Sequence, residues 1–426
     1  MRRLNALLIG MALAASACGG SGAGTPRTMT GNLVIANFNP FSGPDADFGP
    51  EEYAGCYPAI QLINRAGGVL GHQLDCLNVD TQGDPVKGEL ALRNLLASTP
   101  NLVAILGPSS DESVPTVPLI DAAHIPMFLD AGQRMYDRTS YQYLWRLTPS
   151  DDAAGYAMAV WAYKQGYRRG ATLFGNDTDQ ANVPTLLKGF ARLGGTVVIN
   201  EPYVEGKTSY TAEVDAVIQA RPDVIFTEID AQTAAPFFSE FVKRHPPVPI
   251  VGTQVTAQPD WLQAVSGAIG AQTLATSFAG VQPYAAPQGR PWEVFNDALL
   301  AASSEVPNPG QWSSDPYAMA NYDAVTIAAL AMVEAGTTDP RFYNRFIKTV
   351  VDGGTNAVVV HSYDEGIKAL AANHAIQYVG PSGPIVFDTW HNVAGGFSVV
   401  SYDPSGETKL TGAVDAAAVA RLSASP

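Results

Sequence analysis

Short apolar runs that alternate with longer, helix-like segments are the feature that most constrains the fold of this 426-residue chain. The run at 102–106 (LVAIL) stops at a Gly-Pro pair, and the segment 114–123 behind it is apolar and long enough for a helix. Such a run indicates a buried strand, and strands that alternate with helices form a parallel sheet covered on both faces. The alternation extends over 33–129 and again over 151–252. The sequence therefore predicts an α/β fold with two such domains in tandem.

The composition is that of a globular protein, and it limits the classes of partner. Hydrophobic residues make up 46% of the chain and charged residues 15%, which is enough apolar material for two cores. The formal net charge is −15. Nucleic-acid binding is driven by basic surfaces that release counterions from phosphates. We therefore expect no nucleic-acid partner.

The N-terminus has the pattern of an export signal. Two arginines precede an uncharged stretch at 4–17, which is too short to span a bilayer. We interpret 1–17 as a signal peptide. The sequence LAASAC, which ends at Cys18, resembles the lipobox of bacterial lipoproteins, in which the cysteine is acylated. The Gly/Ser-rich stretch at 18–31 would then be a flexible tether that starts at the lipidated cysteine. The alternative is cleavage after Ala17, which would release a soluble protein.

The remaining cysteines agree with export. With Cys18 assigned to the lipid, Cys56 and Cys76 form an even pair in an oxidising compartment. We predict a disulfide between them that joins the first helix to the second strand, and the alternative is two buried thiols. No spacing of cysteine and histidine resembles a zinc site, so we expect neither a metal nor another cofactor.

Ser109 and Ser110 occupy a position that suits ligand binding. They follow the strand at 102–106 and precede a helix, whose first turn has unpaired N–H groups and a positive dipole end. In open α/β sheets ligands bind outside the carboxyl ends of the strands. A carboxylate or a hydroxyl-bearing ligand would fit there. The alternative is that Ser110 or Ser113 only caps the helix.

Ten segments resemble, in order and spacing, the type I periplasmic binding proteins of the branched-chain amino acid ABC transporter class. They are FNPFSGPDADFG, INRAGGVLGHQL, DTQGDPVKG, AILGPSS, HIPMF, WRLTPSD, LGGTVV, NYDAV, SYDEGIKAL and YVGPSGPIVFD. The resemblance implies a type I periplasmic binding protein fold, with two doubly wound parallel-sheet lobes joined by three hinge crossings. It assigns 32–148 and 280–395 to the first lobe, 149–279 and 396–415 to the second, and 416–426 to a C-terminal tail.

The resemblance places candidate ligand-binding residues of the first lobe in the cleft between the lobes. Phe48 stands where the family has an aromatic wall, although it could instead anchor the loop on the first helix. Ser109 and Ser110 lie in the loop that holds the ligand carboxylate. In the segment after HIPMF we include Ala131 and Gln133, and Gln133 stands where the family usually has a hydroxyl group. Carboxylate binding should therefore be weakened.

The candidates in the second lobe also depart from the family. Asp179 and Asp230 stand where amino acid binders commonly have tyrosine, and Gln254 lies near the usual partner of the ligand ammonium. Either aspartate could instead cap the next helix. If both face the cleft, they suit a ligand with several hydroxyls or a cationic group, because an unpaired buried carboxylate is costly. We therefore expect branched-chain amino acids to bind weakly or not at all.

Together these patterns predict an extracytoplasmic, lipid-anchored and monomeric solute-binding subunit of an ABC importer. It would capture a small polar ligand, such as an amino acid or a similar compound, and its partners would be permease subunits and the membrane. The alternatives are a binding protein for an amide, polyamine, sugar or aromatic acid, and a ligand-sensing lipoprotein without a transporter. We expect no enzyme, because Ser109 lacks the G-x-S-x-G pattern of a hydrolase nucleophile and no histidine lies in a catalytic motif.

Overall fold

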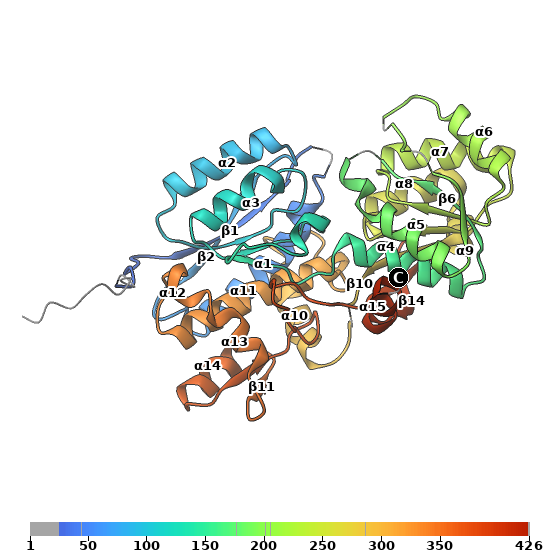
Figure 1. Cartoon of the computed structure of the whole chain (residues 1–426). Coiled ribbons are helices and arrows are strands. Elements are labelled where there is room, and N and C mark those ends of the chain that lie inside the picture. The colour runs from blue at the N-terminus through green and yellow to red at the C-terminus, as the bar shows by residue number, and fades with distance from the viewer. Residues whose placement is uncertain are drawn as a thin grey trace, which may run out of the picture.

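The computed structural model describes residues 25–43, 45–175, 177–200, 202–204, 206–285 and 287–424, without the side chains of 177–179. Two sheets, each flanked by helices, form two lobes that lie side by side (Figure 1). The predicted signal peptide, Cys18 and residues 19–24 of the predicted tether lie outside the described residues. The rest of that stretch is not a free tether: Met29 is buried in the core of the first lobe, and the Arg27 N–H donates to Asp339 at 2.7 Å. Among the described residues, no helix has both the length and the apolar character that a bilayer crossing needs.

The first lobe is built on a parallel sheet in the order β2-β1-β3-β4-β5. Helices α1 and α11 cover one face of this sheet, and α2 and α3 cover the other. Every residue of β3 is buried, as the uninterrupted apolar run predicts. The first elements are β1 (Leu33–Asn39), α1 (Phe48–Arg65), β2 (Leu74–Asp80), α2 (Pro85–Ser98), β3 (Leu102–Leu106), α3 (Ser113–Ala122), β4 (Met127–Phe128), the 3-10 helix η1 (Arg134–Tyr136) and β5 (Leu144–Trp145).

The second lobe is built on a sheet in the order β14-β13-β10-β9-β8-β6-β7. Its strands are parallel except for β13, which pairs antiparallel with β10 and β14. The elements before the C-terminal third are α4 (Asp151–Lys164), β6 (Arg169–Leu173), η2 (Asp177–Asn182), α5 (Val183–Arg192), β7 (Thr196–Ile199), α6 (Thr211–Ala220), β8 (Val224–Thr227), α7 (Ala231–Arg244), β9 (Ile250–Gly252), η3 (Val255–Ala257), α8 (Pro259–Ile269), α9 (Ala271–Ser277) and β10 (Phe278–Pro283).

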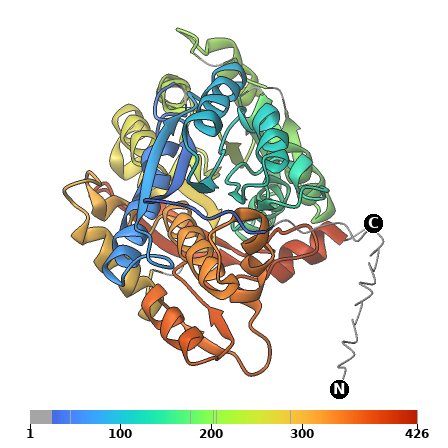
Figure 2. The same ribbon diagram turned by 90° about the vertical axis from the view of Figure 1, so that its left-hand side faces the viewer.

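The C-terminal third contributes to both lobes. Its helices pack with α1 in the core of the first lobe, where Figure 2 shows them in orange beside the blue helix, and its last two strands join the second sheet. Helix α11 is buried over most of its length because it is apolar on all sides. The elements are α10 (Arg290–Ala301), η4 (Pro309–Trp312), α11 (Pro316–Ala335), α12 (Pro340–Tyr343), α13 (Phe346–Asp352), β11 (Val358–Val360), α14 (Tyr363–Ala371), β12 (Ile376–Tyr378), β13 (Phe397–Tyr402), β14 (Thr408–Val414) and α15 (Ala416–Ala424).

The chain passes between the two sheets three times, after β5, after β10 and before β13. The first and third passages run side by side, because Arg146 and Asn392 form a parallel bridge. Two expected boundaries differ in detail. Residue 280, where we expected the chain to re-enter the first lobe, lies inside β10 of the second sheet. The predicted tail forms α15, which packs against α4 and α5.

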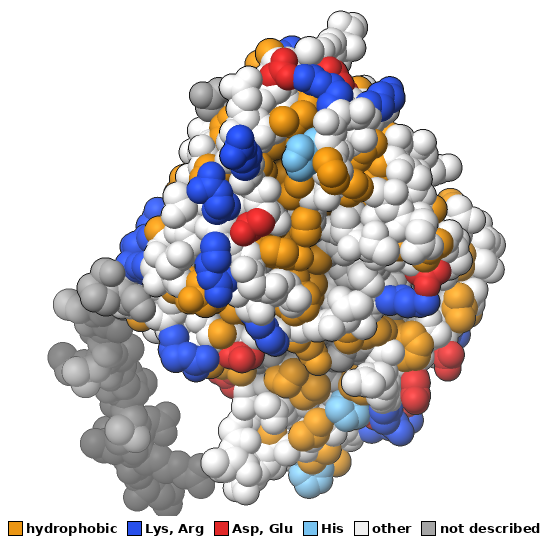
Figure 3. Space-filling view, turned by 90° about the vertical axis from the view of Figure 1, so that its right-hand side faces the viewer, with side chains coloured by type: hydrophobic (Ala, Val, Ile, Leu, Met, Phe, Trp, Pro, Cys, Tyr) orange, Lys and Arg blue, Asp and Glu red, His pale blue; other side chains and the backbone are white. Residues whose placement is uncertain are grey.

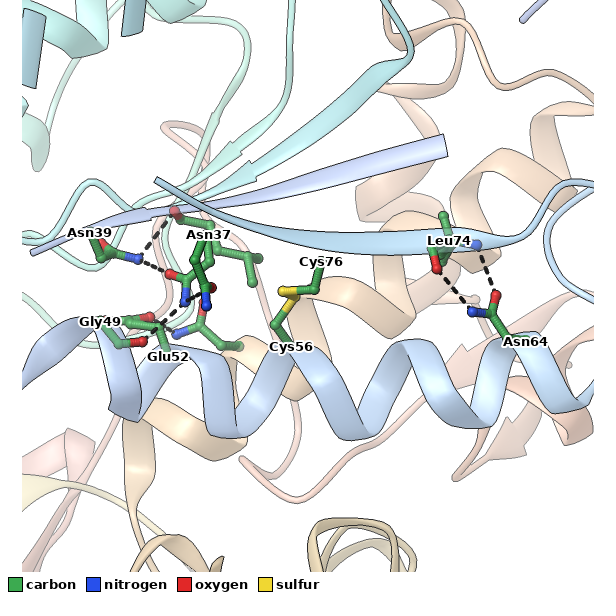
Figure 4. Close-up of a disulfide and its surroundings, with 11 residues drawn as sticks. Asn37, Asn39, Gly49, Glu52, Cys56, Asn64, Leu74 and Cys76 are labelled. Atoms are coloured by element: carbon green, nitrogen blue, oxygen red, sulfur yellow. Dashed lines mark hydrogen bonds between the residues drawn. A yellow bond between two sulfur atoms is a disulfide. The ribbon is translucent and has the colours of Figure 1, made fainter. Parts of the chain in front are cut away.

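The disulfide between Cys56 and Cys76 is confirmed, and it joins α1 to β2 (Figure 4). It closes a loop with a sequence separation of 20, for which the expected stabilisation is about 3 kcal/mol. Nearby, Asn64 donates a hydrogen bond to the Leu74 carbonyl at 2.9 Å and accepts one from the Leu74 N–H at 2.8 Å. Helix α1 is therefore held firmly against the edge of the first sheet.

Candidate functional site

A cavity of about 580 Å³ lies between the two lobes. Six of the predicted ligand-binding residues line it: Phe48, Ser109, Ser110, Gln133, Asp230 and Gln254. Ala131 does not line it; this residue is buried in the first lobe, where its N–H donates to the Pro108 carbonyl at 3.1 Å. The side chain of Asp179 lies outside the described residues.

Acidic side chains dominate the wall of the cavity. The described lining residues include no lysine, arginine or histidine, but they include nine carboxylic acids. These are Asp45, Asp47, Glu51, Glu52, Asp130, Asp151, Glu228, Asp230 and Asp260. Only Asp230 was singled out from the sequence. The wall of the cavity is therefore rich in carboxyl groups and has no basic side chain among its described residues.

The first turn of α1 faces the cavity because the loop before it is fixed to the sheet. Asn37 on β1 donates a hydrogen bond to the Gly49 carbonyl at 3.0 Å (Figure 4). Asp80, at the end of β2, accepts from the N–H groups of Phe41 and Ser42 at 2.9 and 3.2 Å. These contacts lie at the carboxyl ends of parallel strands, where ligands of α/β proteins bind.

Glu51 connects the two lobes across the cavity. Its Oε1 accepts hydrogen bonds from Nε2 of Gln254 at 2.8 Å and of Gln258 at 3.0 Å, both in the second lobe. Its carboxyl group also contacts that of Asp315, the residue that caps α11. Burial, and then the charge of Asp315, raise the pKa of Glu51 well above its usual value. The lobes are in contact through this buried carboxyl group.

Glu52 and Asp130 form a second pair of carboxyl groups on the first lobe. They share a hydrogen bond, and the amide nitrogen of Asn321 donates to Glu52 and, at 3.2 Å, to Asp130. Burial raises the pKa of Asp130 to about 6. Two carboxyl groups in contact cannot both stay ionised without a compensating charge.

Asp47 and Asp260 form a third pair, and this one spans the cleft. Asp47 precedes α1 of the first lobe, and Asp260 lies in the first turn of α8 of the second. Burial, and then the charge of Asp260, raise the pKa of Asp47 to about 6. A proton or a bound cation would therefore favour the approach of the two lobes.

The loop that carries Ser109 and Ser110, here called the serine loop, already forms hydrogen bonds with carboxylates of the protein itself. The N–H groups of Ser109 and Ser110 donate to Oε1 of Glu112 at 3.2 and 3.3 Å, and the Ser110 hydroxyl donates to Asp45. Burial raises the pKa of Glu112 to about 7, although these two N–H groups act in the opposite direction. The alternative that Ser110 or Ser113 caps α3 is wrong, because Glu112 is the N-cap residue and no side chain caps the helix.

Asp230 caps a helix, as the alternative interpretation of this residue expected, and it also lines the cavity. It is the N-cap residue of α7, and it accepts from the N–H and the hydroxyl group of Thr233 at 2.9 and 2.8 Å. A carboxylate that caps a helix keeps free lone pairs, so the same group can also accept a hydrogen bond from a ligand.

Sequence reasoning missed most of the acidic lining for a physical reason. Glu51 and Glu52 open a helix, where carboxylates favour the helix dipole and usually face water. Tyr317 lies far away in the sequence and lines the cavity because α11 packs on α1, and the same packing brings Asp315 to Glu51. Asp130 is the second residue after the end of β4, and that position was the one available signal.

The described residues hold no group of three or more His, Cys, Asp or Glu side chains arranged to bind a metal ion. Most carboxyl groups of the cavity contact one another, amides or hydroxyls instead. The site therefore offers acceptors to a ligand that carries N–H or O–H donors.

Comparison with known proteins identifies the family. A family model described as "Periplasmic binding protein" matches residues 33–407. The chemotactic signal transduction system substrate-binding protein BasB of Halobacterium salinarum is 24% identical over 369 residues, which are 83% of each chain. The leucine-, isoleucine-, valine-, threonine- and alanine-binding protein of Pseudomonas aeruginosa is 38% identical, but only over 93 residues, 22% of this chain and 23% of that protein.

Solved structures share the whole fold. The branched-chain amino acid transporter substrate-binding protein LivJ of Streptococcus pneumoniae, in complex with isoleucine, has a TM-score of 0.73 at 18% identity and covers 90% of this chain and 99% of its own. A solute-binding protein of R. palustris, in complex with benzoate, has a TM-score of 0.70 at 16% identity, with 90% and 97% covered. The chain therefore belongs to the type I periplasmic binding proteins of the branched-chain amino acid binding class.

Proposed function

We propose that this protein captures a small polar ligand in the cavity between its lobes and releases it to an ABC importer. The observation that carries the proposal is the cavity itself, with walls from both lobes and with Glu51 bonded to Gln254 and Gln258 across it. A ligand held by both lobes favours the closed arrangement by the difference in its contacts between states. Binding, rather than chemical conversion, is the proposed activity.

The polar lining supports a ligand unlike a branched-chain amino acid. The structural relatives were solved with isoleucine and with benzoate, each of which has an apolar body and a carboxylate. In this chain the wall is acidic, and the N–H groups of the serine loop already donate to Glu112. Burying an aliphatic side chain against carboxylates would cost free energy that methyl groups do not return.

We also propose that the protein is exported and anchored by a lipid on Cys18. The apolar stretch, the LAASAC sequence and the family support this location. A Cys18→Ser variant should fold normally but leave the membrane fraction. A variant that sediments with membranes as the parent does would contradict the anchor.

A second candidate function is ligand sensing without transport. The relative from Halobacterium salinarum is a substrate-binding protein of a chemotactic signal transduction system, and its similarity extends over 83% of this chain. Both functions use the same closing cleft. Deletion of the gene separates them, because only the transport function predicts lost uptake of the ligand.

The binding function is tested by a thermal-shift screen of amino acids, amides, polyamines, sugars and aromatic acids, since a ligand of the folded state raises the melting temperature. Calorimetry then compares the parent with Phe48→Ala in the first lobe and Gln254→Ala in the second. Each change should weaken the ligand by about tenfold or more, and the ligand should be recovered unchanged.

The matched control for these variants is Asp364→Asn, which removes an exposed charge on α14 that is not part of the cavity lining. A ligand whose affinity is the same in all three variants would bind outside the cleft. That result would refute the proposed function.

A further inference from the structure

The charge balance of the cleft is one-sided. Its described lining has nine carboxylic acids and no basic side chain, whereas Lys and Arg side chains lie on the outer face of the second lobe (Figure 3). Burial raises the pKa of the lining residue Asp151 to about 7, and the charge of Arg146, which lies outside the lining, offsets that effect only in part. A ligand that enters the cleft therefore meets carboxyl groups and no basic side chain among the described lining residues.

The donors that would hold a ligand carboxylate are already used. The two N–H groups of the serine loop donate to the buried Glu112, and the Ser110 hydroxyl donates to Asp45. The other oxygen of Glu112 has no hydrogen-bond partner among the described residues. A carboxylate brought to this loop would face two carboxyl groups of the protein and would find only the Ser109 hydroxyl free.

Several buried oxygens around the cleft have no hydrogen-bond partner among the described residues, and the same is true of two donor atoms of Arg146, Nε and Nη1. Oε1 of Gln133 and Oγ of Ser109, both lining residues, are buried and have no hydrogen-bond partner among the described residues. The same holds for Oδ1 of Asn321, a residue only 1% exposed whose amide nitrogen contacts the lining residues Glu52 and Asp130. Buried polar atoms are rarely left unpaired, so the amide oxygens of Gln133 and Asn321 indicate missing donors, whereas the Ser109 hydroxyl can accept or donate.

The paired carboxyl groups also indicate that a positively charged donor is missing. Glu52 contacts Asp130 within the first lobe, and Asp47 contacts Asp260 across the cleft. When both members of such a pair are ionised they repel each other, and a cation placed between them removes the repulsion and joins the lobes.

We infer that the cleft binds an organic cation that carries ammonium or guanidinium N–H donors and has no free carboxylate. The inference rests on the proposed function and names the ligand class for the same site. A guanidinium or a diamine supplies several N–H donors in one ligand, which matches several carboxylates and unpaired oxygens. An amino acid brings one ammonium but also a carboxylate, for which the occupied serine loop has no place.

The test uses pairs of probes in which the second member carries a carboxylate. Calorimetry on the full chain compares agmatine with arginine, putrescine with ornithine, and benzylamine with benzoate. In the first two pairs the carboxylate is the only difference, and in the third it replaces the aminomethyl group. At least one of the three amines should bind, about tenfold or more tighter than its partner. Asp130→Asn should weaken that amine, whereas the exposed control Asp364→Asn should not.

Glu112→Ala provides the converse experiment, because it frees the N–H groups of Ser109 and Ser110. The preference for the amine over its carboxylate partner should then decrease by about tenfold. If this variant does not fold, the probe pairs on the parent protein still decide the matter.

Three results would overturn the inference. They are no amine bound at millimolar concentration, a carboxylate partner that binds as tightly as its amine, and amine binding that Phe48→Ala and Gln254→Ala leave unchanged. In the second case, if Phe48→Ala and Gln254→Ala weaken the binding of arginine or benzoate, the cleft is still the binding site and the proposed function stands. In the third, the cleft would not be the binding site, and the proposed function would fail as well.

Discussion

Asp230 shows how one side chain can serve the fold and the site together. Its carboxylate caps α7 through Thr233 and lines the cavity from the second lobe. A cap accepts hydrogen bonds from backbone N–H groups and needs only an oxygen, whereas a cationic ligand needs the charge. The two roles can therefore be separated by substitution.

Asp230→Asn should keep the cap and change the free energy of unfolding by only a few tenths of a kcal/mol, because Asn and Asp cap equally well. It should weaken the ligand by about 1.5–3 kcal/mol, as expected for one charge-assisted hydrogen bond. Asp230→Ala should in addition lower stability by about 1 kcal/mol.

Denaturation and calorimetry on both Asp230 variants measure the two effects. Asp84 is the matched control, since it caps α2 in the same way but is absent from the cavity lining. An Asp230→Asn protein with unchanged ligand affinity would show that Asp230 only caps.

At the scale of elements, the acidic lining depends on how closely α1 and α11 approach each other. Gly55 lies at their contact, where an added Cβ would be 2.3 Å from the Ala318 carbonyl oxygen and 2.7 Å from the Tyr322 nitrogen. Both atoms belong to the backbone, so they cannot move aside without shifting the helix. This approach brings Glu51 to Asp315 and Glu52 to Asn321.

Gly55→Ala should therefore lower the free energy of unfolding by about 1–3 kcal/mol, as overpacking of a core does. Gly267→Ala is the control, because Gly267 lies exposed in α8 with nothing within 4 Å of its added Cβ. That variant should gain up to about 1 kcal/mol from helix propensity. Equal effects from both substitutions, measured by urea denaturation, would contradict the tight contact.

At the scale of the whole molecule, the paired carboxyl groups couple the stability of the protein to pH. Burial raises the pKa of Asp47 and Asp130 to about 6 and that of Asp151 to about 7, from a usual value near 4. The folded protein thus holds protons that the unfolded chain has already lost. Each such group stabilises the folded state fully at a pH below its pKa in the unfolded chain. This contribution to stability is lost as the pH rises through the pKa of the group in the folded protein.

The melting temperature of the ligand-free protein should therefore fall between about pH 4, near the pKa of these groups in the unfolded chain, and about pH 7, the highest of their pKa values in the folded protein. Burial lowers the pKa of His391, so this residue makes the protein more stable as the pH rises. Its single contribution is smaller than the summed effect of the carboxyl groups. Asp47→Asn should raise the melting temperature at the alkaline end, since it removes the repulsion by Asp260 and no cap is lost.

The control for this prediction is Asp364→Asn, whose exposed surface pair should leave the pH profile unchanged. A melting temperature that is flat or that rises over the same range, measured by calorimetry, would mean that the carboxyl groups of the cleft are not protonated in the folded state.

The sequence by itself determined the elements and the family. The apolar run of β3, the Asp-Pro start of α2 and the pair Cys56–Cys76 are local signals, because strands, caps and an even number of cysteines act over short distances. The family motifs then predicted two lobes and located six residues that line the cavity. Each of those residues follows a strand or opens a helix near the carboxyl edge of a sheet.

Only the tertiary structure decided the chemistry of the cleft. Glu112 looked like an ordinary residue at the start of a helix, but in the fold its carboxylate occupies the N–H groups that the serine loop would offer a ligand. Glu51 meets Gln254 and Gln258 at sequence separations of 203 and 207. Burial and long-range pairing, which no local pattern encodes, set the charge that a ligand meets.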